Sequence, residues 1–299
     1  MRLGFVGVGN MGGPMAANLA AAGHELVVFD TRREVAADLL AGGAVWADSP
    51  RAVAEAGVDA ILLSLPTPPI VEAVVTGPDG VLAGCSAGQT VIDLSTNAPA
   101  VVQRLAEVCA AQGVGFLDAP VSGGVRGARD GTLAVMVGGD ADLFERFRPA
   151  FDAIGARTFR LGGVGAGNVA KLINNQLAFI GMMGTIEAIV LGGKAGLDPV
   201  VLRDLVSSSS GASSAWDNAT RVILKDRLRP TFTVELAAKD IGLAQDLATE
   251  QGVETPMGAA AHAVIRGFLE GGYADEDLIA TVKAVEERSG FVVRGTWHD

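Results

Sequence analysis

Two polar side chains stand four residues apart in an otherwise apolar stretch of the chain. The segment AKLINNQLAFIGMMGTIEA (170–188) has no charged residue between Lys171 and Glu187. It reads as a helix, in which Lys171 and Asn175 share one face and can reach the same atom. A lysine can exchange a proton with an alcohol or a carbonyl oxygen if its pKa falls from about 10.4 toward ~8. The pair is therefore a candidate proton-transfer site, and a lysine whose stem covers apolar surface is the alternative interpretation.

A glycine-rich loop near the start of the sequence is typical of dinucleotide binding. Gly7, Gly9 and Gly12 fit the pattern G-x-G-x-x-G, with Asn10 and Met11 inside it, between the strand-like run RLGFV and a helical pattern. The first glycine allows a tight turn and the second lets the backbone approach a pyrophosphate. The third lets the helix pack on the strand, with its N-terminus toward the phosphates. The loop therefore predicts a site for a nicotinamide dinucleotide.

An acidic residue at the end of the next predicted strand supports this prediction. Asp30 lies 18 residues after Gly12, where a carboxylate can accept hydrogen bonds from the ribose hydroxyls. It would also repel a 2′-phosphate, which favours NAD as the cofactor. Arg32 and Arg33 follow closely and are able to accept a phosphate, so NADP is the alternative.

Two kinds of pattern divide the chain and position these residues. The first part alternates strands and helices, which implies a mostly parallel, doubly wound sheet of the Rossmann type over residues 1–163. Its strands are expected at 2–6, 26–30, 60–65, 90–95, 114–120, 132–139 and 158–161. The remainder, 164–299, reads as an all-helical domain that begins with a long interdomain helix. Its helices are expected at 166–193, 199–207, 213–225, 233–251, 257–270 and 276–288.

Composition and charge narrow the classes of partner. The chain has 23 basic and 34 acidic residues, a net charge of −11 that disfavours nucleic acid and anionic membranes. Cys85 and Cys109 form no CxxC motif and read as buried thiols of a reducing compartment. The histidines, His298 among them, form no cluster, so no metal site is predicted. The apolar stretch 177–191 is interpreted as too short to span a membrane. With a predicted strand directly after Met1, no signal peptide is expected and a cytoplasmic location is predicted.

Four motifs, in order along the whole chain, resemble those of the β-hydroxyacid dehydrogenase family. They are GFVGVGNMGGPMAANL, DAPVSGGVRGARDGTLAVMVGG, GAGNVAKLINNQ and LAAKDIGLAQD. The resemblance implies a dehydrogenase that interconverts a small 3-hydroxy acid and its semialdehyde or keto acid by hydride transfer. It also implies that the helical domain, 164–299, serves in substrate binding and in oligomerisation to a homodimer or homotetramer. It places the catalytic lysine at Lys171 and its supporting asparagine at Asn175. It assigns the substrate carboxylate to Ser122, Gly123 and Gly124, and further cofactor contacts to Leu65, Pro66, Thr96 and Lys239.

Several alternatives stay open at this stage. Imine reductases share the architecture but replace the lysine, and the chain is too short for the C-terminal domain of 6-phosphogluconate dehydrogenase. A non-catalytic dinucleotide-binding module would not need Lys171. Instead of binding the cofactor, Lys239 could form a salt bridge with Asp240. Instead of binding a carboxylate, Ser122-Gly123-Gly124 could form an ordinary turn. The segment 207–222 is expected to help shape the substrate pocket, but the sequence does not identify the substrate.

Overall fold

The computed structural model describes residues 1–297, so His298 lies outside the described part of the chain. Two compact units make up the chain, Met1–Lys171 and Leu172–Asp299. The boundary predicted at 163/164 falls just before this division, between the last strand of the first unit and the long helix α9, Ala166–Lys194. That helix is continuous, so its first turns belong to the first unit and the rest to the second.

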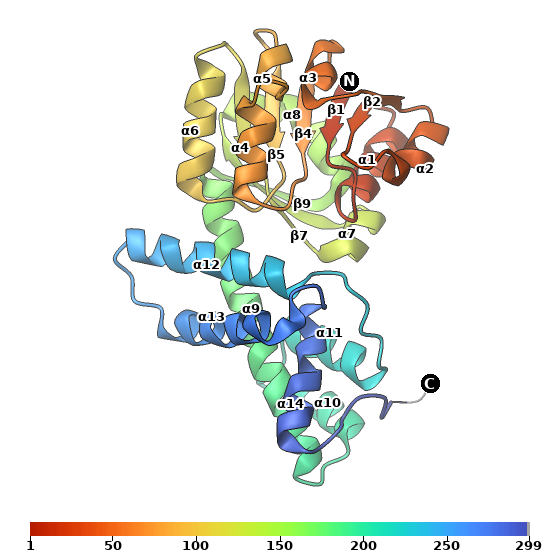
Figure 1. The fold of residues 1–299 in the computed structure, drawn as a ribbon, viewed down its shortest axis with the longest axis vertical. Helices are drawn as coiled ribbons and strands as arrows, with labels where there is room; N and C mark the ends of the chain where they lie inside the picture. Colours follow the sequence, from red (N-terminus) through yellow and green to blue (C-terminus); the bar gives the residue numbers. More distant parts are fainter. Residues whose placement is uncertain (298–299) are drawn as a thin grey trace. The chain divides into compact units, whose positions relative to one another are not determined.

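A nine-stranded sheet forms the centre of the first unit (Figure 1). Its strands are β1 (Arg2–Val6), β2 (Glu25–Phe29), β3 (Val45–Trp46), β4 (Ala60–Leu63), β5 (Thr90–Asp93), β6 (Gly115–Asp118), β7 (Val121–Ser122), β8 (Leu133–Gly139) and β9 (Gly155–Gly162). The order is β3-β2-β1-β4-β5-β6-β8-β7, with β9 paired to β8. The first six strands run parallel, whereas β8 runs antiparallel to β6 and β7. The mostly parallel Rossmann-type sheet predicted from the sequence is thus present.

Helices cover both faces of this sheet because its strands are apolar on both sides. On β4, Ile61 and Leu63 belong to one hydrophobic cluster and Leu62 to the other, as expected when successive side chains alternate. The flanking helices are α1 (Gly12–Ala21), α2 (Ala37–Ala41), α3 (Pro50–Glu55), α4 (Pro68–Thr76), α5 (Val81–Gly84), α6 (Pro99–Ala110), α7 (Gly124–Asp130) and α8 (Ala141–Ile154), with a 3-10 turn at Arg33–Ala36.

Helices build the second unit around the long helix α9. They are α10 (Pro199–Ser207), α11 (Ser214–Leu224), α12 (Val234–Glu250), α13 (Pro256–Phe268) and α14 (Val282–Ser289), with a π turn at Leu269–Tyr273 and a 3-10 turn at Leu278–Thr281. Side-chain oxygens at the preceding residue accept from the first-turn amides of α10, α11 and α12, which fixes where these helices begin. Phe179, Met183 and Ile186 of α9 lie in the buried core of this unit.

The helix predicted at 166–193 is present as α9, which runs for 29 residues. The stretch 177–191 taken alone is too short to span a membrane, whereas the whole helix is long and apolar enough by length and composition. The core helix of a soluble protein meets the same test, and 39% of the relevant window is buried inside the structure. The feature is therefore weak evidence for a membrane span.

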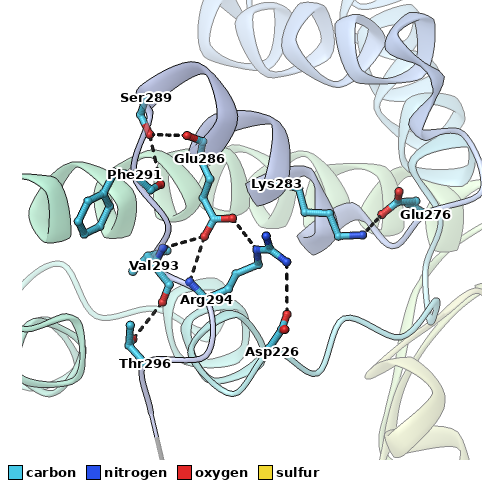
Figure 2. A network of polar contacts seen from close by, with 9 residues as sticks. All are labelled: Asp226, Glu276, Lys283, Glu286, Ser289, Phe291, Val293, Arg294 and Thr296. Atoms are coloured by element: carbon cyan, nitrogen blue, oxygen red, sulfur yellow. Dashed lines mark hydrogen bonds and ion pairs between the residues drawn. The ribbon is translucent and has the colours of Figure 1, made fainter.

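A buried glutamate holds the C-terminal segment of the second unit (Figure 2). Glu286, whose side chain is 2% exposed, accepts from the backbone amides of Val293 (2.8 Å) and Arg294 (3.0 Å) and also pairs with the Arg294 guanidinium. Arg294 reaches on to Asp226, at 3.6 Å. The buried carboxylate thus has both backbone donors and a cation, which is what its desolvation requires.

Short elements account for most of the differences from the predicted secondary structure. The strands β3 and β7, at two residues each, and the seven-residue helix α7 were not expected. The helix predicted at 276–288 begins instead as a 3-10 turn at Leu278. Cys109 is buried as expected, but Cys85 is only half-buried, and both are free thiols.

Candidate active site

The glycine loop has the geometry that its pattern predicted. Gly7 has φ +89°, and a methyl group there would lie 2.4 Å from the Ser64 carbonyl oxygen. A methyl group on Gly12 would lie 1.8 Å from the Gly7 carbonyl oxygen, so helix α1 packs directly on the turn after β1. At Gly9 the nearest atom to such a methyl is in the Arg32 side chain, 3.8 Å away, which leaves open space beside the backbone. Open space at the second glycine is what a pyrophosphate needs, so the loop fits a dinucleotide.

Asp30 is joined directly to this loop. Its Oδ2 accepts from the Val8 amide at 3.0 Å, and its Oδ1 accepts from the Arg32 amide at 3.0 Å. The Asp30 side chain is 11% exposed, and the Arg32 guanidinium lies 3.9 Å from it with 64% of its side chain exposed. Arg33 lies with its guanidinium over the Trp46 ring, 5.2 Å from the centroid. Asp30, for which the sequence predicts a contact with a ribose, therefore also helps to hold the loop.

The loops that follow β4 and β5 are hydrogen-bonded to each other. Leu65, in the first loop, donates its amide proton to the Ser95 hydroxyl at 2.9 Å. Thr96 follows Ser95, and Pro66 follows Leu65, so the cofactor contacts predicted on these two loops lie on connected segments. Because β4 and β5 are adjacent parallel strands, both loops leave the sheet at the same edge.

The predicted carboxylate-binding segment begins in a strand and ends in a helix. Ser122 is half-buried at the end of β7, and Gly124 begins α7. Gly123 and Gly124 both have positive φ, 134° and 63°, which explains why glycine occupies both positions. Arg126, in α7, is exposed and pairs with Asp130 at 3.4 Å. The segment presents a hydroxyl group beside the exposed backbone of two glycines, and at Gly124 no atom lies within 4 Å of the position that a Cβ would take.

Helix α9 carries Lys171 and Asn175 on one face, as their spacing predicted. Lys171 is half-buried and Asn175 is 6% exposed. The Asn175 amide donates to Asp240 Oδ2 at 2.7 Å, while its Oδ1 accepts from Asn174 at 3.2 Å. The orientation of the Asn175 carboxamide is thereby fixed from both ends.

Asp240 contacts two predicted site residues, whereas the sequence indicated it only as a salt-bridge partner of Lys239. Its buried carboxylate lies between Asn175 and Lys239, whose Nζ is 2.9 Å from Asp240 Oδ1. The salt bridge considered for Lys239 is therefore present, and through Asp240 it also reaches Asn175. The only signal in the sequence was the acid directly after Lys239, because Asn175 is 65 residues away.

Two further carboxylates are buried under the loops of the first unit. Burial raises the pKa of Asp93 to about 6, although hydrogen bonds from Ser95 and Asn97 oppose the shift. Burial likewise raises the pKa of Asp118, against donors from Gly165 and Asn168. Among residues 1–297, no group of three His, Cys, Asp or Glu side chains is placed to hold a metal ion.

The segment 207–222 lines a hollow of about 520 Å³ in the second unit. Its lining residues are Arg203, Ser207, Ser214, Asp217, Asn218 and Arg221, and none of them is a predicted site residue. Trp216 instead lies in the core, where its Nε1 donates to the Arg203 carbonyl at 3.1 Å.

Comparisons with known proteins cover most of the chain. Residues 2–163 match the family model described as the NAD binding domain of 6-phosphogluconate dehydrogenase. Residues 165–285 match that described as NAD-binding of NADP-dependent 3-hydroxyisobutyrate dehydrogenase. The 3-hydroxyisobutyrate dehydrogenase of Pseudomonas aeruginosa is 44% identical, over 87% of this chain and 89% of that protein. The NAD-dependent L-serine dehydrogenase of the same organism is 40% identical, over 97% and 99%. The solved structure of Mycobacterium tuberculosis 3-hydroxyisobutyrate dehydrogenase with L-serine has a TM-score of 0.85 at 33% identity, over 95% of this chain and 98% of that one.

Proposed function

This chain belongs to the β-hydroxyacid dehydrogenase family, and we propose that it uses NAD as its cofactor and Lys171 as its general acid and base. The family makes it an NAD(P)-dependent oxidoreductase that interconverts small 3-hydroxy acids and their semialdehydes or keto acids. The observation that carries the proposal is the placement of Lys171 and Asn175 one turn apart on the single helix α9.

A bound nicotinamide would supply the acceptor for hydride in oxidation and the donor of hydride in reduction. Lys171 takes the hydroxyl proton during oxidation and returns it to the carbonyl oxygen during reduction. Asn175 supports this exchange with a carboxamide that Asp240 and Asn174 hold in one orientation. Ser122, Gly123 and Gly124 bind the substrate carboxylate through a hydroxyl and accessible backbone amides.

The surroundings of Asp30 support NAD over NADP. A 2′-phosphate near this carboxylate would meet a negative charge, and Arg33, which would otherwise attract it, already lies against Trp46. Gly7, Gly9, Asn10, Met11 and Gly12 of the first unit hold the pyrophosphate, with Leu65, Pro66 and Thr96 as further contacts. The ratio of kcat/KM for NAD over NADP tests this choice. A ratio above 10 is expected for the wild type, and a ratio below 1 would overturn it.

Exposed apolar side chains support a homodimer or homotetramer formed through the second unit. Ile173, Leu177 and Leu191 on α9 are 55%, 66% and 70% exposed, and Val201 and Leu205 on α10 are exposed as well. Ile173 and Leu177, like Val201 and Leu205, are four residues apart on one helix, and exposed apolar pairs of this kind suit a protein interface. Sedimentation should show an oligomer that Leu177→Glu dissociates, and a wild-type monomer would contradict the proposal. The two free thiols suit the reducing cytoplasm that we propose as its location.

The experiment that tests the function compares initial rates for wild type, Lys171→Ala and Lys194→Ala. The panel is L-serine, 3-hydroxyisobutyrate and the corresponding semialdehydes, each with NAD(H) and NADP(H). Lys194→Ala is the matched control because Lys194 lies at the far end of the same helix, where it donates to the Ser289 carbonyl. Loss of turnover of roughly 10²–10⁴-fold is expected for Lys171→Ala alone. Equal turnover in all three proteins would refute the role of Lys171.

A further inference from the structure

The first turn of α9 is fixed to a buried carboxylate of the sheet. Asp118, at the end of β6, is fully buried. Its Oδ1 accepts from the Gly165 amide at 2.8 Å, and its Oδ2 accepts from the Asn168 amide at 2.8 Å and from the Asn168 side chain at 3.2 Å. A carboxylate at a helix N-terminus satisfies amides that have no partner inside the helix. Because Lys171 follows Asn168 by three residues, this anchor lies within one turn of the proton-transfer group.

Two glycines allow this close approach. A methyl group on Gly167 would lie 2.3 Å from the Met136 carbonyl oxygen, and one on Gly138 would lie 2.3 Å from Asp118 Oδ1. Both contacts are far shorter than van der Waals distances, so any other residue at either position would push the helix off the sheet. The start of α9 is therefore seated on β6 and β8 with little freedom to shift.

The same asparagine also binds the loop that follows β5. Asn168 Oδ1 accepts from the Asn97 amide at 2.7 Å, so its carboxamide joins α9 to that loop at one end and to Asp118 at the other. The Asn97 side chain in turn donates to Asp93 at 3.3 Å. Thr96, a predicted contact of the cofactor, lies between Ser95 and Asn97, and both of these neighbours bond to Asp93.

We propose that Asn168 is a positioning residue, which sets the place of Lys171 relative to the Thr96 loop by bridging Asp118 and Asn97. The proposal rests on the proposed function of Lys171, because only a proton-transfer lysine needs such placement. Proton and hydride transfer require reacting groups in near-attack geometry, and a displacement of about 1 Å can cost roughly 100-fold in rate. A single amide that bonds both segments keeps their separation constant.

A matched control separates positioning from simple stabilisation. Gln89 is another buried amide of the same unit. It accepts from the Ser86 amide at 2.6 Å and donates to the Ala54 and Val58 carbonyls at 3.0 and 2.8 Å. None of these three partners belongs to α9, and none of these three hydrogen bonds involves a residue of α9. Gln89→Ala and Asn168→Ala therefore remove comparable buried bridges, and only the second bridge reaches the helix of Lys171.

The experiment measures thermal stability, the Kd for NADH, kcat and KM for wild type and both variants. Both variants should unfold at lower temperature. Asn168→Ala should also lower kcat about 10- to 100-fold while KM and the Kd for NADH stay within about threefold, whereas Gln89→Ala should keep its kcat. If Asn168→Ala does not fold, Asp118→Asn replaces it, because this isosteric change places a donor opposite the Gly165 or Asn168 amide. Equal kcat in wild type and the Asn168 or Asp118 variant would overturn the proposal.

A second readout needs no turnover, so it distinguishes failure of this proposal from failure of the proposed function. The chain has only five lysines, Lys171, Lys194, Lys225, Lys239 and Lys283. Selective ¹³Cε labelling should give five resolvable signals, with that of Lys171 assigned through Lys171→Arg. Asn168→Ala should shift the Lys171 signal and Gln89→Ala should not. An unmoved Lys171 signal would overturn the positioning role even in a protein that turned over no substrate on the panel.

Discussion

Replacing Gly12 by alanine tests whether the glycine loop works as its geometry implies. The added methyl carbon would lie 1.8 Å from the Gly7 carbonyl oxygen, and real contacts of this kind are not shorter than 3.0 Å. Helix α1 would have to move by at least about 1.2 Å, the difference between these distances. It cannot do so freely, because Met15, Ala16 and Leu19 pack with no exposed surface into the core.

The loss of stability expected for Gly12→Ala follows from the tight packing of helix α1. Overpacking of a well-packed core costs about 1–3 kcal/mol, and a clash between two backbone segments belongs at the upper end. At roughly 2–4 °C per kcal/mol for a domain of this size, about 3 kcal/mol lowers Tm by roughly 6–12 °C. Affinity for NADH should fall as well, since the amides at the start of α1 move with the helix.

Gly9→Ala is the control for this prediction. Its methyl group would meet only the Arg32 side chain, at 3.8 Å, so Tm should stay within about 2 °C of the wild type. The methyl group would nevertheless occupy the space expected for the pyrophosphate, so the Kd for NADH should rise at least about tenfold. Differential scanning fluorimetry and fluorescence titration measure both quantities. An unchanged Tm for Gly12→Ala, or an unchanged Kd for Gly9→Ala, would refute the reasoning.

Three further predictions concern the stability and reactivity of buried groups. Glu286→Ala should destabilise the protein by about 3–5 kcal/mol, measured by urea unfolding. It removes the acceptor of two backbone amides and leaves the Arg294 guanidinium with Asp226 alone. A loss below about 1 kcal/mol would contradict this account. The pKa of Asp93 is raised from 3.8 to about 6, so its contribution to stability is greatest below pH 3.8 and is lost as the pH rises through 6. Asp93→Asn should therefore remove a pH dependence of the unfolding free energy on the order of 3 kcal/mol. Parallel curves of unfolding free energy against pH for the two proteins would count against this prediction. Burial raises the pKa of the Cys85 thiol to about 11 and that of the Cys109 thiol to about 12. Both thiols should therefore resist alkylation by iodoacetamide at pH 7.5 until urea unfolds the chain. Fast labelling of the folded protein would contradict this prediction.

Local sequence patterns predicted the elements but not the long-range polar partners. The glycine loop, Asp30 and the helix starting at Pro199 are readable because their signals lie within a few neighbouring residues. Strands of two residues such as β3 are too short to show a periodicity. The bridges from Asn175 to Asp240 and from Asn168 to Asn97 join residues 65 and 71 positions apart, so only the folded chain reveals them. Nothing near Asn168 in the sequence marks its carboxamide as the bridge.

The bond between Asp30 and the Val8 amide has an evolutionary consequence. The carboxylate expected to discriminate against a 2′-phosphate is the same group that accepts from the glycine loop. A change of cofactor preference that begins by removing this acid therefore also deprives Val8 of its hydrogen-bond acceptor, at a cost of about 1–3 kcal/mol. A lineage that moves toward NADP by losing Asp30 therefore gives up this stability unless another acceptor for the Val8 amide arises first. A change from NAD to NADP thus costs less stability if the mutation that supplies a new acceptor for the Val8 amide precedes the loss of Asp30.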